Sequence, residues 1–469
     1  MKAVLPFVAT LLAASVAHAQ AVTEIVSPAA DRVATAVTVY NDNLALVKER
    51  RKVTLPGGPV RLSLRDVSAQ MKPETALLSA VNGKPISLIE QNFDFDLLTP
   101  QKLLDKYVGR EVTVIRGNPA TGAETREKAT VLAASQGTVL RFADRIETGV
   151  PGRLAFDSVP GTLRDRPTLS VLLDATAANA QTLELSYLTG GLAWKADYVA
   201  NLGDGGKTLD LNGWVTLTNS SGAAYESATL QLVAGTLNRA QPERREFLAK
   251  GAMVAMAADA APREEALMDY HLYTFDRPTT LAENQTKQLA LLSATSVPAE
   301  REYLLAGNDY YYMGRFDTLG EKLKPAVFVI FQNKGGQLGK PLPAGVMRVY
   351  ARDSQGAAQF VGEDNIAHTA KNETVRLRLG EAFDITADRK QTNYRRLSDR
   401  SNENSYSIVI RNAKAEPVTV KVQEPMPGDW EITQQSQKHV KESAHVALWN
   451  ITVPAEGSAI LEYTARVKW

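Results

Sequence analysis

The stretch Leu209–Asn219, which reads LDLNGWVTLTN, shows the pattern on which the fold prediction rests. Leu211, Gly213, Val215 and Leu217 occupy alternate positions, and polar or aromatic residues stand between them. Successive side chains of a β-strand point to opposite faces of its sheet, so this two-residue period indicates a strand with one buried face. The stretch is therefore predicted to be a strand.

The same period recurs along most of the chain, interrupted by turns rich in Gly, Pro and Asn. Asn82-Gly83 predicts a tight hairpin between strands at Ala76–Val81 and Pro85–Glu90. Leu98–Tyr107 is the exception and is predicted to form one or two helical turns. Other expected strands include Thr35–Tyr40, Gly109–Arg116, Gln181–Tyr187, Trp194–Leu202, Glu300–Leu305, Phe383–Asp388, Asn404–Asn412, Pro417–Glu424, His445–Val453 and Ser458–Val467.

The order and spacing of these strands predict an all-β protein. We expect a β-sandwich with an inserted SH3-like small barrel and a C-terminal Ig-like sandwich. Between residues 241 and 268 the chain becomes Arg/Glu-rich and then Ala/Met-rich, which favours a flexible linker; an amphipathic helix is the alternative. The expected parts are 20–98 (N-terminal β domain, first part), 99–162 (inserted barrel), 163–240 (sandwich strands), 241–268 (linker), 269–400 (sandwich continuation) and 401–469 (Ig-like domain).

Residues 1–19 have the three parts of a secretory signal. Lys2 gives a basic start, Ala3–Val16 is apolar, and Ala17-His18-Ala19 offers small residues at the cleavage site. The sequence predicts a signal-peptide helix that is removed after Ala19, with a retained N-terminal anchor as the alternative. The expected location is periplasmic or secreted, and because the chain has no Cys it is not a lipoprotein.

Composition narrows the classes of function. Without Lys2, basic and acidic residues number 52 each, so the balance of charge gives no support for binding nucleic acid. The absence of Cys excludes thiol catalysis and thiolate metal sites. No stretch after the signal is apolar enough to predict a membrane-spanning helix.

Several segments resemble the bacterial family called domain of unknown function 4139. They are Tyr187–Tyr198 (YLTGGLAWKADY), Leu217–Gly222, Ala228–Gly235, Lys340–Tyr350 (KPLPAGVMRVY) and Val361–Asp364. The resemblance covers most of the chain after the signal and is firmest from about residue 180 onward. It implies a β-rich exported protein and supplies no catalytic residues.

The strand Val37–Val47 is similar to the partner domain of mucoidy-inhibitor-like relatives in that family. The long coil region typical of those relatives is not found in this sequence.

Two aromatic groups are candidate binding residues. Trp194 and Tyr198 lie four positions apart near a Gly-Gly turn and could form a platform for a sugar or peptide; the alternative is that Trp194 anchors the core. Tyr310, Tyr311 and Tyr312 stand in succession. In a strand, Tyr310 and Tyr312 would share one face, and their rings suit glycan or protein recognition. An exposed hairpin end with one ring packed inward is the alternative.

No catalytic or metal site is expected, and no cofactor. The four His outside the signal, His271, His368, His439 and His445, show no ligand spacing, and no G-x-S-x-G or S-x-x-K stands in a useful context. The sequence therefore favours a non-enzymatic exported protein that binds an envelope protein or a glycan. A hydrolase whose site assembles only in three dimensions is the alternative.

Overall fold

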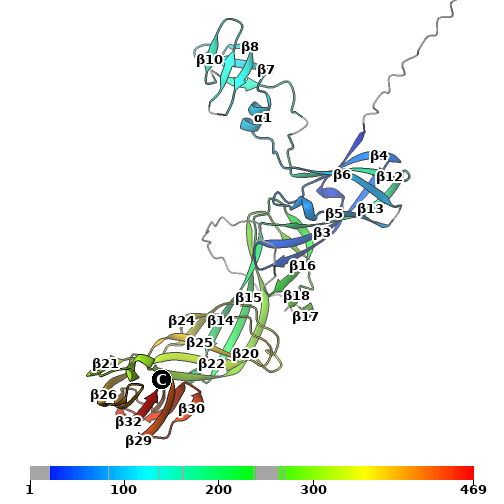
Figure 1. Cartoon of the computed structure of the whole chain (residues 1–469). Coiled ribbons are helices and arrows are strands. Elements are labelled where there is room, and N and C mark those ends of the chain that lie inside the picture. The colour runs from blue at the N-terminus through cyan, green and yellow to red at the C-terminus, as the bar shows by residue number, and fades with distance from the viewer. Residues whose placement is uncertain are drawn as a thin grey trace, which may run out of the picture. The chain divides into compact units, whose positions relative to one another are not determined.

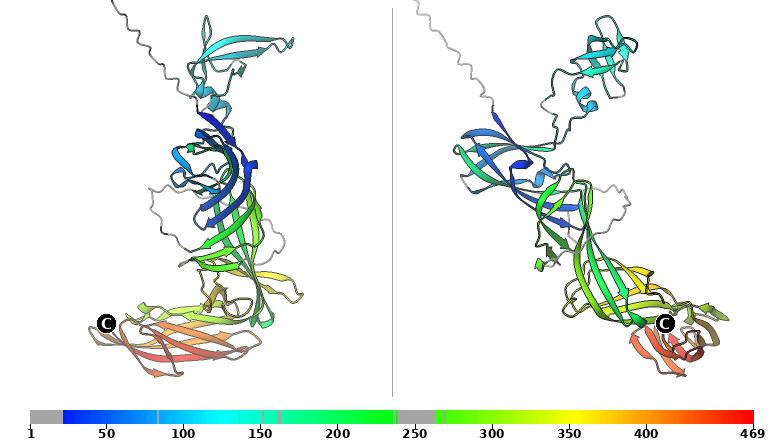
Figure 2. Two further views of the ribbon diagram at one scale, coloured as in Figure 1. Left: turned by 90° about the vertical axis from the view of Figure 1, so that its right-hand side faces the viewer. Right: turned by 180° about the vertical axis from the view of Figure 1, so that it is seen from behind.

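The computed structural model describes residues 22–235, except 83, 136, 151, 161 and 162, together with 238, 263–267 and 270–469. The predicted signal, 1–19, and linker residues 241–262 and 268 lie outside the described residues. Strands account for 65% of the structure and helices for 5%, and strands predominate in every view (Figures 1 and 2). The prediction of an all-β protein is confirmed.

The chain forms two compact units. The first consists of Met1–Ala36, Leu46–Gly190 and Ser221–Ser227, and the second of Val37–Ala45, Gly191–Ser220 and Ala228–Trp469. The chain passes from one unit to the other within β2 (Arg32–Tyr40), β3 (Leu44–Leu55) and β16 (Tyr225–Ala234), and also between Gly190 and Gly191 and between Ser220 and Ser221.

The first unit contains a four-stranded sheet in the order β1-β4-β12-β6. Its strands are β1 (Thr23–Ser27), β4 (Gly58–Arg65), β12 (Thr168–Ala175) and β6 (Ile86–Asp94). β1 and β4 are parallel, and β12 is antiparallel to both β4 and β6. Leu62, Leu64, Leu169, Val171 and Leu173 are fully buried along this sheet, as the alternating pattern requires.

The hairpin predicted at Asn82-Gly83 is wrong. β5 (Leu77–Asn82) pairs with β13 (Asn179–Thr189), whereas β6 pairs with β12 in another sheet. Long-range pairing with strands about a hundred residues further on therefore overrides the local turn preference.

A five-stranded antiparallel sheet, in the order β10-β9-β8-β7-β11, follows the only α-helix among the described residues. The helix, α1 (Pro100–Lys106), confirms the turns predicted at Leu98–Tyr107; Pro100 is its first residue, and the Thr99 side chain caps it by accepting from the Lys102 N–H. Tyr107, Val114, Val131 and Leu140 form part of the core between helix and sheet. The strands are β7 (Glu111–Gly117), β8 (Glu124–Ala133), β9 (Val139–Arg141), β10 (Ile146–Thr148) and β11 (Arg153–Ala155).

The second unit is built around the predicted strand Leu209–Asn219, which is β15 (Thr208–Asn219). β15 lies between β14 (Leu192–Leu202) and β20 (Gln285–Ala306), antiparallel to both. The strand predicted at Glu300–Leu305 is the second half of one long strand, because β20 continues from its pairing with β15 into pairing with β22 and β28. The same sheet also contains β22 (Ala326–Gln332), β23 (Gly345–Arg352), β24 (Ala358–Ile366) and β25 (Thr374–Glu381), whereas β18 (Tyr270–Thr274) and β19 (Thr279–Leu281) pair with β16 in another sheet.

Part of the predicted linker is a strand. Arg263–Leu267 forms β17 and pairs antiparallel with β18. Backbone hydrogen bonds to a neighbouring strand order this segment, although its sequence, REEAL, shows no two-residue period.

The last part of the second unit places two groups of strands on either side of one core. The first group is β28, β31 and β30, and the second is a five-stranded sheet in the order β21-β26-β27-β32-β29. Fully buried residues of both groups, such as Val420, Trp449, Ile408 and Leu461, belong to one cluster. The strands are β21 (Thr318–Leu323), β26 (Ile385–Ser398), β27 (Ser401–Asn412), β28 (Val418–Pro425), β29 (Asp429–Gln435), β30 (Val440–Ser443), β31 (Val446–Val453) and β32 (Gly457–Lys468).

Candidate functional site

Trp194 and Tyr198 are buried in β14, with exposed fractions of 4% and 0%. The Tyr198 hydroxyl donates to the Pro343 carbonyl at 2.8 Å, so its polar end is satisfied inside the protein. Neither residue belongs to the cluster around Tyr312. Neither ring presents a face to a ligand in this structure.

The three successive tyrosines lie on a short 3-10 helix, Asp309–Tyr312, and not on a strand. Their exposure falls along the sequence: Tyr310 is 47% exposed, Tyr311 is 9% and Tyr312 is fully buried. One ring therefore faces solvent while the following two point into the core.

Tyr312 is held by a buried ionic pair. Its hydroxyl donates to Glu424 Oε2 at 3.1 Å and shares a hydrogen bond with the Tyr463 hydroxyl at 2.8 Å. On the other side of the carboxylate, Arg389 Nη2 donates to Glu424 Oε1 at 2.7 Å. Arg389 and Glu424 have almost no exposed surface.

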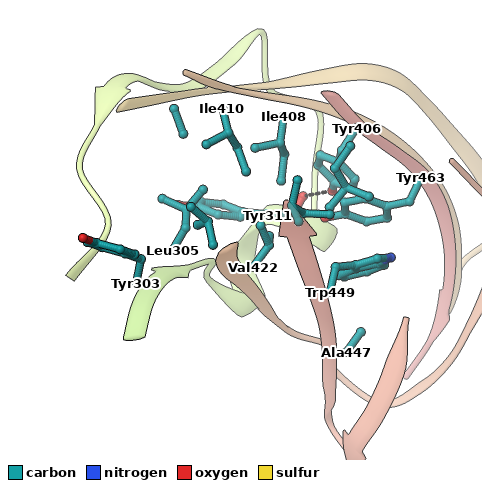
Figure 3. Close-up of a cluster of buried hydrophobic side chains, with 14 of the residues drawn as sticks. Tyr303, Leu305, Tyr311, Tyr406, Ile408, Ile410, Val422, Ala447, Trp449 and Tyr463 are labelled. Carbon is teal, nitrogen blue, oxygen red and sulfur yellow. Dashed lines mark hydrogen bonds between the residues drawn. The ribbon is translucent and has the colours of Figure 1, made fainter. Parts of the chain in front are cut away.

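Aromatic rings surround this pair on one side. Tyr406 stacks on Tyr463 with ring centroids 5.1 Å apart, and Tyr463 stacks on Trp449 at 4.7 Å. Figure 3 shows Tyr406, Tyr463 and Trp449 grouped together within the buried cluster. Stacked rings at these separations stabilise the core and exclude water from the ion pair.

Burial and pairing act on the two charges in opposite directions. Burial raises the pKa of the Glu424 carboxyl, and the Arg389 guanidinium and the Tyr312 hydroxyl oppose that shift. Burial, the largest single effect, lowers the pKa of Arg389, but the Glu424 carboxylate and the neighbouring tyrosines together outweigh it, and the pKa lies above its ordinary value. Since an arginine stays charged in proteins, Glu424 is the counter-charge that makes its burial tolerable.

The main chain of the segment Asn308–Phe316, which we call the tyrosine loop, is fixed by side chains of β26 and β27. Gln391 donates to the Gly314 carbonyl at 3.0 Å and accepts from the Phe316 N–H at 2.8 Å. The Tyr406 hydroxyl donates to the Tyr311 carbonyl at 2.7 Å. The loop conformation is thus set by the core beneath it before any partner arrives.

The outer side of the tyrosine loop is apolar and aromatic. Tyr310 contacts Tyr311 and Phe316 edge to face, at centroid distances of 4.7 and 5.8 Å. Met313 is 55% exposed, and Arg315 is also exposed. Tyr, Met and Arg are the residue types enriched in protein interfaces, so the loop offers a preformed contact surface.

Arg389 and Glu424 were not predicted from the sequence, although their positions in the strand pattern indicate that they are buried. Arg389 continues the inward positions of Ile385 and Ala387, and Glu424 continues those of Val420 and Val422. A charged residue in the apolar phase of an alternating strand indicates a buried charge that needs a partner.

The first unit shows the same signal. Glu49 and Arg51 occupy inward positions of β3 and are buried. Arg51 Nη2 lies 2.7 Å from Glu49 Oε1, and Arg32 Nε lies 2.6 Å from Glu49 Oε2. Each unit therefore contains a buried arginine–glutamate pair.

Among the described residues, no three His, Asp or Glu side chains come together to hold a metal ion. His368 accepts from the Ala344 N–H at 3.1 Å through Nδ1. Within the same residues, no helix has the length and apolar character to cross a membrane.

The described residues define a strand-built protein with a rigid aromatic loop above a buried ionic core. A family model described as Domain of unknown function (DUF4139) matches residues 183–469. The chain belongs to that family. None of the curated proteins compared with the chain matches it.

Proposed function

We propose that the chain is an exported, non-enzymatic protein of the bacterial cell envelope that binds another envelope protein through the tyrosine loop. The observation that carries the proposal is the loop itself: exposed Tyr310 and Met313 on a backbone pinned by Gln391 and Tyr406. A surface that is ordered before binding loses little conformational entropy when a partner docks.

The export part of the proposal rests on residues 1–19. Cleavage after Ala19 places Gln20 at the start of the mature chain, in the periplasm or outside the cell. Mass spectrometry of the protein from its native host tests this directly: a mature chain that begins at Gln20 supports export, and one that begins at Met1 contradicts it.

The proposal includes an SH3-like barrel in the first unit and an Ig-like sandwich at the C-terminal end of the second. α1 with β7–β11 has the strand number and size of an SH3-like barrel, and β27, β28, β29, β31 and β32 correspond to the strand series predicted for an Ig-like sandwich. Small β domains of these kinds act as scaffolds that present loops, which agrees with a binding role.

A protein partner is favoured over a glycan because Met313 and Arg315 lie beside Tyr310, and because two sides of the Tyr310 ring are occupied by Tyr311 and Phe316. A hydrolase is the less favoured function. Glu424 is fully buried, so no substrate reaches it in this structure.

Site-specific photo-crosslinking in the native envelope tests the proposal. A photoreactive amino acid at position 310 is expected to capture one protein that the same group at Ile460, also half exposed, does not capture. Capture of a glycan at position 310 would show that the loop binds a sugar and would contradict a protein partner. Equal products from both positions would contradict a role for the tyrosine loop.

A further inference from the structure

A cavity of about 310 Å³ opens within the second unit, and none of its lining residues belongs to the tyrosine loop. Its floor is formed by neighbouring strands: Arg301 and Tyr303 of β20, Val327 and Val329 of β22, and Leu379 of β25. The volume is at the lower end of the range for small-molecule sites, and the lining is mainly apolar.

Strand alternation decides which charges face the cavity. In the β20–β22 register Arg301 lies opposite Val329 and Tyr303 opposite Val327. Glu302, between them, projects to the other face of the sheet, where Arg376 and Lys421 pair with it. Glu300 and Glu302, the acidic residues on either side of Arg301 in the sequence, are thus both turned away from it by the strand alternation, and Glu302 is already neutralised.

Two cations gather around Tyr303 inside the cavity. Arg301 Nη1 donates to the Tyr303 hydroxyl at 3.4 Å, and Lys414 Nζ lies 6.0 Å from the centre of the same ring. Both side chains are half buried. In the part of the chain that the structure describes, neither forms an ion pair with a carboxylate.

The mouth of the cavity combines apolar and acidic residues. Phe383 is 83% exposed and Val361 is 39% exposed, although both line the cavity. Glu381, the last residue of β25, and Asp384, on the turn before β26, are exposed and lie close to Phe383 in the sequence. Solvent screens these carboxylates more than it screens the half-buried cations, so the interior favours an anion.

We infer that this cavity is a binding site for a small aliphatic carboxylate. The hydrocarbon part lies on Val327, Val329 and Val361 beneath Phe383, and the carboxylate lies between Arg301 and Lys414 at Tyr303. The apolar floor removes the hydrocarbon of the ligand from water. The two cations, which have no carboxylate partner among the described residues, balance the negative charge of the ligand's carboxylate. The site is independent of the tyrosine loop, so either proposal can fail without the other.

Isothermal titration of the full chain with sodium octanoate, octylamine and octanol tests the inference. Octanoate is expected to bind one site at least about tenfold more tightly than octylamine or octanol. Arg301→Gln and Lys414→Gln are each expected to weaken octanoate binding about fivefold, and octylamine binding is expected to stay unchanged or to strengthen.

Arg378→Gln is the matched control, because Arg378 lies on β25 but does not line the cavity. Circular dichroism shows whether each variant is folded. The inference is overturned if octanoate does not bind the unmodified chain or if octylamine binds as tightly as octanoate. It is also overturned if the variant that combines Arg301→Gln and Lys414→Gln binds octanoate as tightly as the unmodified chain. A loss in only one single variant contradicts a headgroup site made by both cations.

Discussion

Arg389 and Glu424 lie 2.7 Å apart in the interior of the second unit, and the carboxylate of the pair also accepts from Tyr312. Through Tyr312 this buried pair is joined directly to the exposed loop that carries Tyr310. Two roles are therefore divided among three successive tyrosines: the buried Tyr311 and Tyr312 hold the loop, and the exposed Tyr310 can contact a partner.

Glu424→Gln is expected to destabilise the protein, because it leaves the Arg389 guanidinium buried without a counter-charge. Loss of one member of a buried pair costs about 3–5 kcal/mol of unfolding free energy. Urea unfolding followed by tryptophan fluorescence measures the change. Glu431→Gln, at an exposed position on β29, is the control and is expected to change stability by less than about 0.5 kcal/mol. A loss below about 1 kcal/mol for Glu424→Gln would show that the pair is not needed.

Gly307→Ala tests how closely the chain passes the carboxylate. A Cβ at position 307 would collide with the Glu424 carboxylate, whereas one at Gly336 would meet open space. The Gly307→Ala variant is therefore expected to lose about 1–3 kcal/mol of unfolding free energy. Gly336→Ala should match the unmodified protein within error. Equal stabilities of the two variants would mean that the packing around Glu424 is looser than described.

Tyr312→Phe is expected to destabilise the protein more than Tyr310→Ala does. The first removes the hydroxyl shared by Glu424 and Tyr463 and is expected to cost about 1–3 kcal/mol of stability. The second removes a half-exposed ring and should cost less than about 1 kcal/mol. Thermal unfolding of both variants decides the matter. A larger loss of stability for Tyr310→Ala than for Tyr312→Phe would mean that Tyr310, and not Tyr312, holds the loop in place.

Glu302 gives a prediction for the dependence of stability on pH. Burial raises the pKa of Glu302, but Lys421 and Arg376 outweigh burial and hold the pKa below its ordinary value of 4.5. The folded state therefore binds the proton less tightly than the unfolded state. The contribution of this carboxylate is complete above pH 4.5 and is lost as pH falls through the lower pKa of the folded protein.

Unfolding free energies measured from pH 7 to pH 3 check this sign. Glu302→Gln should be less stable than the unmodified protein at pH 7, and the difference should shrink as pH falls below 4.5. A difference that stays constant, or grows on acidification, would contradict the assignment of Arg376 and Lys421 as the partners of Glu302.

The strand content was predictable because single strands carry their own period. Leu209–Asn219 and Asn404–Asn412 are strands in the structure as their alternation indicates. Pairing was not predictable from local pattern. Asn82-Gly83 favours a hairpin, yet its two flanking strands pair with β13 and β12 instead. Which strands become neighbours depends on contacts far apart in the sequence.

The sequence indicated where an exposed aromatic residue lies, but not how the three tyrosines are arranged. The run of three tyrosines pointed to the correct segment for an exposed aromatic residue, but the expected strand would have paired Tyr310 with Tyr312 on one face. Tyr312 is instead drawn inward by a buried carboxylate that lies 112 residues away in the sequence. The alternation of apolar and polar residues along one segment does not show which distant residue will contact it.

The central claim is that Tyr310 contacts a protein partner while Tyr312 only holds the loop. The most direct measurement is the affinity of the crosslinked partner, once purified, for the unmodified chain and for Tyr310→Ala. Removal of an aromatic residue central to an interface costs at least about 2 kcal/mol, so the dissociation constant is expected to rise about thirtyfold. An unchanged dissociation constant for a folded Tyr310→Ala variant would contradict the account.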